Sequence, residues 1–242
     1  MSTSWDICLR MHLLKSANQL RGWIANQRSR DFPYWHMQQV HRALPSWLFH
    51  MRAYKIFYQE AIGQYNPNHL HGSVQKATPA DIPLLTQAGY PRSTLQSWMA
   101  DGASAWFIAD KGNLLASIWL NASQHYKLYI WLELKSPTRV VWFLWWWVAP
   151  EHRRRHLGMQ VRMPAAMAYQ ENGHAQGVAV IDALNRNALK GVQKLGWILI
   201  SRLLVIRCCG VTMVYFANRF YVGRWDAANP LALCIETKHF TK

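Results

Sequence analysis

One apolar run, VVWFLWWWV at 140–148, constrains the fold more than any other feature of the sequence. It holds four of the chain's 14 Trp residues. Because the side chains of a strand alternate between its two faces, Trp145 and Trp147 are expected on one face, and Trp142 and Trp146 on the other. A strand with aromatic residues on both faces is typical of a sheet that is covered on both sides. The run is far shorter than the roughly 20 residues of a transmembrane helix.

The composition excludes two classes of chain. The 242 residues are 51% apolar and 16% charged, whereas a disordered chain combines low hydrophobicity with a high density of charge. Four Cys residues are too few for a small disulfide-stapled protein, and the absence of a Cys-x-x-Cys pair argues against a metal or redox site. Asp6, Arg10 and Lys15 interrupt any N-terminal secretory signal, so a cytoplasmic protein is expected, with attachment to the inner face of a membrane as the alternative.

The charge is strongly positive. Lys and Arg outnumber Asp and Glu by 27 to 12, a formal charge of +15. Such an excess favours an anionic partner, which is a nucleic acid, a membrane or a phosphate-rich cofactor. No stretch resembles a nucleic-acid recognition motif, so nucleic acid is the least favoured of the three. A solvated basic surface without a partner is the structural alternative.

Apolar periodicity and turn residues predict a mixed α/β (α+β) fold, in which helices flank a mostly antiparallel sheet. Thr78 is a candidate N-cap with Pro79 at the first helical position, and the turn at 111–113 predicts a hairpin. Strands are predicted at 73–77, 105–110, 114–121, 126–134, 140–148, 177–183, 197–207 and 211–216, and helices from 78, over 91–100, over 154–172 and over 187–195.

Residues 1–70 are predicted to form a basic, amphipathic helical extension, and residues 71–242 the main domain. Apolar residues recur at helical spacing over 5–30 and 36–62, and the polar segment 64–72 resembles a linker. The first sixty residues carry eight basic and three acidic side chains. Two placements stay open: peripheral contact with a membrane or partner through residues 1–60, or a helical cap packed on the main domain.

The most informative segment for chemistry is VAPEHRRRHLGM at 148–159. An apolar strand leads into a compact basic turn and then directly into a helix. The first turn of a helix has unpaired backbone N–H groups, which together with the helix dipole favour an anion, especially a phosphate. Three consecutive Arg residues add positive charge, and Gly158 permits close approach of the backbone. The segment therefore predicts a diphosphate site.

This segment resembles motif A of the GNAT superfamily, the acyl-CoA-dependent N-acyltransferases. The family pattern is Arg/Gln-x-x-Gly-x-Gly/Ala, and here it reads Arg153-x-x-His156-x-Gly158. Two other segments resemble family landmarks in the same order: TPAD at 78–81, and NRNA followed by KLGW within 185–197. The resemblance covers about residues 73–216.

The resemblance implies a GNAT-like central sheet, acetyl-CoA or another acyl-CoA as co-substrate, and no metal. The strand that ends at Val148 would part from its neighbour and hydrogen-bond the pantetheine arm, the basic turn would hold the diphosphate, and Asn185 with the following helix would line the other side. The implied cofactor-binding residues are Trp146, Trp147, Val148, Arg153, Arg154, Arg155, His156, Leu157, Gly158, Met159, Asn185 and Ala188.

Four positions depart from the family pattern. His156 and Arg154 stand where the family commonly has Gly, which predicts a wider turn. Pro164 lies inside the predicted helix, where it removes a hydrogen bond. Many family members also place a Tyr general acid just before the Lys-Leu-Gly segment, and here that position is Val192.

Two carboxylates are candidate bases for the chemistry that the resemblance implies. Asp182 stands near the carboxyl end of a central strand, where ligands bind in α/β folds, although a hydrogen-bonded turn residue is the alternative. Glu133 lies in a strand with aromatic neighbours, although a surface charge is the alternative. A base would neutralise the attacking amine, and the thiolate leaving group needs little help from an acid.

The sequence thus predicts an N-acetyltransferase that moves an acetyl group from acetyl-CoA to a primary amine in a ternary complex. The acceptor is an unidentified small molecule, with an amino sugar or a nucleotide- or lipid-linked precursor as candidates. One alternative is transfer of a longer acyl chain from acyl-CoA or acyl carrier protein, with the Trp cluster as an apolar channel rather than core. Another is a non-catalytic basic module that binds nucleic acid or an anionic membrane.

Overall fold

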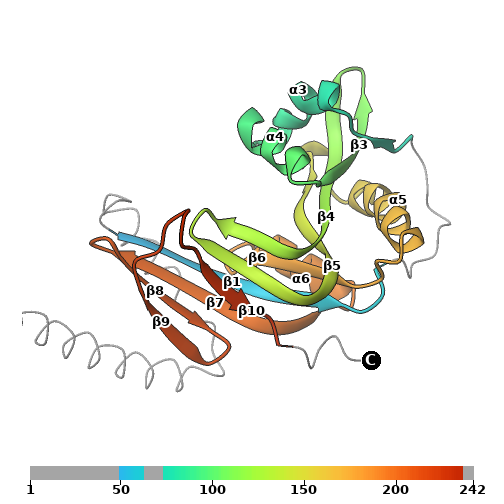
Figure 1. Ribbon diagram of the computed structural model, residues 1–242. Coiled ribbons are helices and arrows are strands. Elements are labelled where there is room, and N and C mark those ends of the chain that lie inside the picture. The colour runs from blue at the N-terminus through green and yellow to red at the C-terminus, as the bar shows by residue number, and fades with distance from the viewer. Residues whose placement is uncertain (1–48, 63–72, 237–242) are drawn as a thin grey trace, which may run out of the picture.

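The computed structural model describes residues 49–62 and 73–236, which form a ten-stranded sheet with helices on both faces (Figure 1). The sheet order is β2-β3-β4-β5-β6-β1-β7-β8-β9, and β10 pairs with β5. The strands are β1 (Phe49–Gln59), β2 (Gln75–Lys76), β3 (Ser104–Asp110), β4 (Asn113–Tyr129), β5 (Leu132–Val148), β6 (Gly177–Asp182), β7 (Ile198–Cys208), β8 (Val211–Phe216), β9 (Arg219–Gly223) and β10 (Leu231–Cys234). The helices are η1 (Pro79–Asp81), α3 (Ile82–Leu85), η2 (Thr86–Ala88), α4 (Arg92–Ala100), η3 (Pro150–His152), α5 (Leu157–Glu171) and α6 (Arg186–Lys194).

The predicted fold class is confirmed. Only the β5–β6 and β5–β10 pairs of this sheet are parallel, and every other described pair is antiparallel. The local signals behave as expected: the Thr78 backbone N–H donates to the Asp81 carboxylate at 2.8 Å, and Lys111 and Gly112 adopt the positive φ values of a two-residue hairpin turn. None of the described helices is long and apolar enough to cross a membrane.

β1 lies in the middle of the sheet, where the sequence analysis predicts a helix. It pairs antiparallel with β6 on one edge and with β7 on the other. The predicted helix over 36–62 is therefore wrong from Phe49 to Gln59. The predicted helix over 5–30 and the predicted linker over 64–72 lie outside the described residues, which resume at Ser73.

The cause of this error is a competing period in the sequence. Apolar Phe49, Met51 and Ala53 alternate with polar His50 and Arg52, which is the period of two of a strand. The strand continues into IFY at 56–58, and β-branched and aromatic residues favour a strand over a helix. Tertiary pairing on both edges then decides the conformation.

Helices cover the two faces of the sheet in different places. Val161 and Ala165 of α5 pack with Ile118 of β4, whereas Leu85 of α3 and Leu95 of α4 pack around the next residue of β4, Trp119. Neighbouring residues of a strand point to opposite faces, so we name these the α5/α6 face and the α3/α4 face. On the former, α6 packs through Leu189 and Val192.

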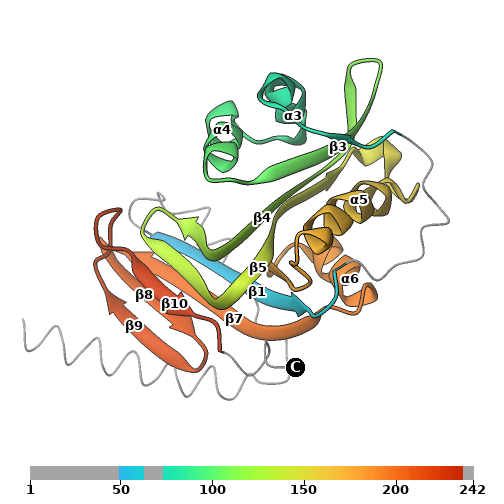
Figure 2. The same cartoon turned by 45° about the vertical axis from the view of Figure 1, so that its right-hand side comes forward.

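The outer halves of β4 and β5 form a second layer on the α3/α4 face (Figure 2). Leu132 and Leu134 of β5 share a buried cluster with Ile56 of β1, Leu203 of β7 and Val214 of β8. This layer changes one prediction, because the strand expected at 126–134 is divided by a turn between β4 and β5. The sequence tail, for which no structure is predicted, supplies β9 and β10.

A β-bulge in β5 changes which Trp residues share a face. The register of β5 on β4 skips Leu144, which is therefore an extra residue in the strand. Simple alternation fails at this point: Trp142 lies on the α3/α4 face with Trp145 and Trp147, and Trp146 points to the α5/α6 face. The prediction that Trp142 and Trp146 share a face is wrong, since periodicity alone contains no sign of the extra residue.

The central position of β1 makes a prediction about stability. Ile56 is 0% exposed, so Ile56→Ala should lower the free energy of unfolding by about 2–5 kcal/mol. Ile130→Ala is the control, because Ile130 is 77% exposed at the β4–β5 turn and should change stability by less than about 0.5 kcal/mol. Urea denaturation measures both. Equal, small effects would contradict the placement of β1 in the core.

Candidate functional site

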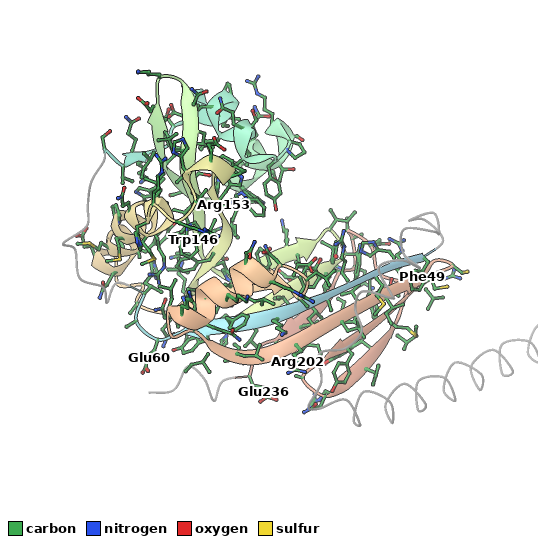
Figure 3. The ribbon with its side chains drawn as sticks, turned by 180° about the vertical axis from the view of Figure 1, so that it is seen from behind. Phe49, Glu60, Trp146, Arg153, Arg202 and Glu236 are labelled. Carbon is green, nitrogen blue, oxygen red and sulfur yellow. The ribbon has the colours of Figure 1, made fainter. Side chains whose placement is uncertain are left out.

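The turn after β5 is held by its own backbone. Ala149 is buried and donates its N–H to the Leu115 carbonyl at 2.9 Å, and η3 follows immediately. The Arg153 Nε donates to the Val148 carbonyl at 3.4 Å. Figure 3 shows Arg153 and Trp146 near the junction of β5 and α5. The turn is thus compact, and its basic side chains extend from a fixed backbone.

Arg154 and His156 both adopt the left-handed conformation, with φ values of 69° and 59°. These are the positions at which the resemblance implies Gly. For a residue with a side chain this conformation costs about 1–2 kcal/mol. The turn therefore follows a path that suits glycine, although its residues are Arg and His. Backbone strain of this kind is typical of functional sites.

The amino end of α5 is open to an anion. No side chain caps this helix, and the Met159 and Gln160 N–H groups both bond to the His156 carbonyl. The N–H groups of Leu157 and Gly158 have no intrahelical acceptor, as at any helix start. Arg153, Arg154 and Arg155 are exposed beside this end. A helix dipole, free N–H groups and three guanidinium groups together suit a phosphate group.

Gly158 has a packing role that the sequence analysis does not anticipate. A Cβ at this position would lie 2.9 Å from Nε1 of the Trp146 indole, which donates to the Gly158 carbonyl at 3.1 Å. The indole of Trp146 therefore fixes the first turn of α5 on β5. Its side chain is used for packing, and only its backbone stays available for a ligand.

β5 and β6 part after a short parallel contact. They pair over Val141–Phe143 and Gly177–Ala179, while β5 continues to Val148 and β6 to Asp182. β4 covers one edge of β5 over this stretch. Within the described residues, the other edge is paired with no strand. Apart from the Val148 carbonyl, which accepts from Arg153, backbone N–H and C=O groups along this opening are thus left for water or for a ligand.

The carboxyl end of β6 leads into α6, whose start is capped. The Asn185 side-chain oxygen accepts from the Ala188 N–H at 3.1 Å. The structure therefore gives these two predicted cofactor residues a shared local role, with Asn185 three residues beyond the end of β6 and Ala188 in the first turn of α6. Val192, at the position of the family's Tyr, is buried under α6 against Phe57 and Trp197.

Asp182 lies in a polar cluster with residues of β1. Its Oδ2 is 3.3 Å from Nη1 of Arg52, and its Oδ1 accepts from the Leu184 N–H at 2.8 Å. Tyr54 is the register partner of Asp182 on β1, so the two side chains share the α3/α4 face. The Asp182 side chain is 31% exposed, which leaves the carboxylate accessible from solvent.

A pair of phenols extends this cluster. The Tyr54 and Tyr129 hydroxyls are 2.5 Å apart, and Nε2 of His50 lies 3.4 Å from the Tyr129 hydroxyl. The Tyr129 ring stacks on Trp131 with centroids 5.0 Å apart. Tyr129 comes from the far end of β4, so the fold joins two tyrosines that are 75 residues apart in sequence.

Burial is the main cause of a raised pKa at both phenols. It raises the pKa of Tyr54 far above 10, and the neighbouring Tyr129 and Asp182 add to the effect. Burial likewise raises the pKa of Tyr129, against the opposing effects of the Tyr54 hydrogen bond and the Arg52 charge. Both hydroxyls therefore stay protonated at neutral pH and can act as hydrogen-bond donors.

Glu133, the other predicted base, lies elsewhere. It alternates with Leu132 and Leu134, whose side chains enter the core, so its own side chain lies on the other side of the β4–β5 hairpin. There it is 2.8 Å from Nδ1 of His125 and 3.8 Å from Nζ of Lys135. The structure thus groups Asp182, and not Glu133, with the phenols.

A cavity of about 350 Å³ lies on the α3/α4 side of the β5 end. Its walls include Trp147, Asp110, Glu151 and His152. Among the described residues, no group of three or more His, Cys, Asp and Glu side chains is placed to hold a metal.

The site predicted from the sequence lacks four residues of the polar cluster, His50, Arg52, Tyr54 and Tyr129. The first three lie in the segment predicted as a helix, and the period of two over 49–55 is the signal that would have placed them on a strand. No local signal identifies Tyr129, because its place depends on how the β4–β5 hairpin folds back.

The sequence matches no protein-family model and no curated protein. Solved structures resemble the fold at low identity. A Drosophila protein has a TM-score of 0.49 and 13% identity over 74% of this chain and 58% of its own. A conserved protein of unknown function from Staphylococcus epidermidis has a TM-score of 0.49 and 8% identity over 81% and 79%. An aminoglycoside N-acetyltransferase in complex with CoA has a TM-score of 0.41 and 16% identity over 51% and 90%.

The Gly158–Trp146 contact predicts an effect of adding one methyl group. Gly158→Ala should destabilise the protein by about 1–3 kcal/mol, because the indole must move. Gly191→Ala in α6 is the matched control, since a Cβ there meets nothing within 4 Å. Alanine in a helix should stabilise by about 0.5–1 kcal/mol relative to glycine. Thermal unfolding compares the two, and effects of the same sign would refute the contact.

The raised pKa of Tyr54 predicts a loss of stability at alkaline pH. Above pH 10 the unfolded chain releases the proton of this phenol while the folded chain retains it, so the free energy of unfolding falls as pH rises. Tyr54→Phe should make this decrease shallower and leave the pH dependence between 7 and 9 unchanged. Urea denaturation at a series of pH values tests this. An unchanged alkaline slope in the variant would contradict it.

Proposed function

We propose that this chain is an acyl-CoA-dependent N-acyltransferase that moves an acetyl group from acetyl-CoA to the primary amine of a small molecule. The observation that carries the proposal is the turn at 153–156, in which Arg154 and His156 hold glycine-like conformations before an uncapped helix. A turn of this shape directs backbone N–H groups toward one point, and the Arg side chains supply charge for a diphosphate.

The parting of β5 and β6 supports the same proposal. A pantetheine arm carries amide groups, and the unpaired edge of Leu144–Val148 offers backbone groups that pair with amides as a neighbouring strand would. The opening and the basic turn are continuous along the chain, since β5 ends at Val148 and the turn follows. A diphosphate at the turn and a thioester further along the opening are therefore compatible.

The proposed chemistry takes place on the α3/α4 face, beside the end of β6. Asp182 accepts a proton from the acceptor ammonium, directly or through water, which leaves a neutral amine. The amine attacks the thioester carbonyl, a C–N bond forms and the C–S bond breaks. The Tyr54–Tyr129 pair relays the proton that the new amide nitrogen must lose to the departing thiolate, so each phenol ends with its own proton, and the pair stands in place of the acid that is missing at Val192.

Binding of CoA tests the donor site. We expect the protein to bind CoA. Arg155→Glu, which reverses one charge, should raise the dissociation constant about tenfold. Arg219→Glu, at the exposed first residue of β9, is the charge-matched control and should leave the affinity unchanged. Isothermal titration calorimetry measures both. Equal losses would indicate non-specific attraction to a basic protein, and no binding to the folded protein would refute the proposal.

Acetyl transfer tests the polar cluster. With acetyl-CoA and a panel of amino sugars and other primary amines, Asp182→Asn should lower kcat/KM by about 10²-fold. Tyr54→Phe should lower kcat by about tenfold and leave the KM for acetyl-CoA unchanged, because a thiolate leaves readily. Glu133→Gln is the comparison for the second predicted base. If it alone abolished activity, the assignment of Asp182 would be wrong.

The same assay separates the alternatives. A longer acyl-CoA used in preference to acetyl-CoA would favour the longer-chain transferase, with the Trp residues of β5 as the walls of its acyl site. Salt-dependent binding to DNA or to anionic vesicles, without any acetyl transfer, would favour a basic binding module.

A further inference from the structure

The α5/α6 face of β1, β7, β8 and β9 carries an apolar surface on the side of the sheet opposite to the proposed site. The register aligns Met51, Ile206, Met213 and Val222 in one row across the four strands, with Ala53 and Leu204 in the next row. We name these six residues the outer apolar face. The alternate residues of the same strands point inward, where Leu203, Val205 and Val214 fill the core.

The described helices do not cover this face. α5 packs on β3, β4 and β5, and α6 packs around Phe57 and Ala179, near the other end of β1. None of the six residues belongs to a hydrophobic cluster formed by described residues. Yet Met51, Ala53 and Ile206 are only 7%, 5% and 8% exposed in the single chain. Part of the same chain must therefore shield them.

We propose that the N-terminal segment, residues 1–48, docks on the outer apolar face as an intramolecular cover. Three segments lie outside the described residues: 1–48, 63–72 and 237–242. Only the first is long enough to cover four strands. It joins β1 at Phe49, the first residue of that strand (Figure 3) and two residues before Met51, so its local concentration at this surface is high.

The dimensions and the pattern of the segment fit this surface. A helix over 5–30, as its apolar spacing predicts, is about 39 Å long, and the 11 residues of β1 or β7 span about 36 Å. Its apolar residues include Leu13, Leu20 and Trp23 on one stripe. With that stripe against the sheet, its Arg and Lys side chains face solvent, which would account for much of the unexplained basic charge.

Site-specific photocross-linking of the full chain tests the proposal. A p-benzoyl-phenylalanine placed at Val222, which is 48% exposed, should cross-link to residues 1–48 of its own chain. The matched control carries the same group at Arg219, an exposed position of β9 that pairs with inward-facing Phe216, and should not reach that segment. Mixing isotopically labelled and unlabelled chains distinguishes cross-links within a chain from those between chains.

Variants of the segment sharpen the test. Leu13→Asp with Leu20→Asp should lower the yield of this cross-link at least about tenfold, because an unpaired carboxylate is costly to bury, whereas Gln19→Asp should preserve it. Circular dichroism verifies that each variant is folded. Cross-links to a second chain, to no segment, or to phosphatidylglycerol vesicles in place of residues 1–48 would each overturn the proposal.

Discussion

The double pairing of β1 is the constraint on which the rest of the structure depends. β6 and β7 do not pair with each other in the described sheet; each pairs with β1. β1 therefore joins the half of the sheet that carries the helices to the half formed by β7, β8 and β9. The backbone bonds on both edges and the burial of Ile56 and Phe57 make this strand a structural centre rather than an appendage.

The same strand supplies half of the polar cluster. Because alternate residues point to opposite faces, β1 presents Arg52 and Tyr54 to Asp182 on one side and Met51 and Ala53 to the outer apolar face on the other. The proposed acceptor side and the proposed docking surface are thus two faces of one strand.

Two irregularities of the backbone shape the proposed donor site. The extra residue at Leu144 and the separation of β5 from β6 interrupt the sheet, and the positive φ values of Arg154 and His156 strain the turn that follows. Each departure leaves backbone groups unpaired or conformational energy stored. Such costs persist where the surrounding packing enforces them, and here Trp146 does so by holding Gly158 against β5.

The sequence by itself determined the elements that depend on local signals. The capping residues at 78–81, the hairpin at 111–113, the strand at 140–148 and the basic turn before α5 could all be predicted, because turn and cap preferences act within a few residues. Only the tertiary structure decided the role of β1, the face of each Trp in β5, and the meeting of Tyr54, Tyr129 and Asp182. These depend on strand register and on pairing between distant segments, and neither is encoded in a local window of sequence.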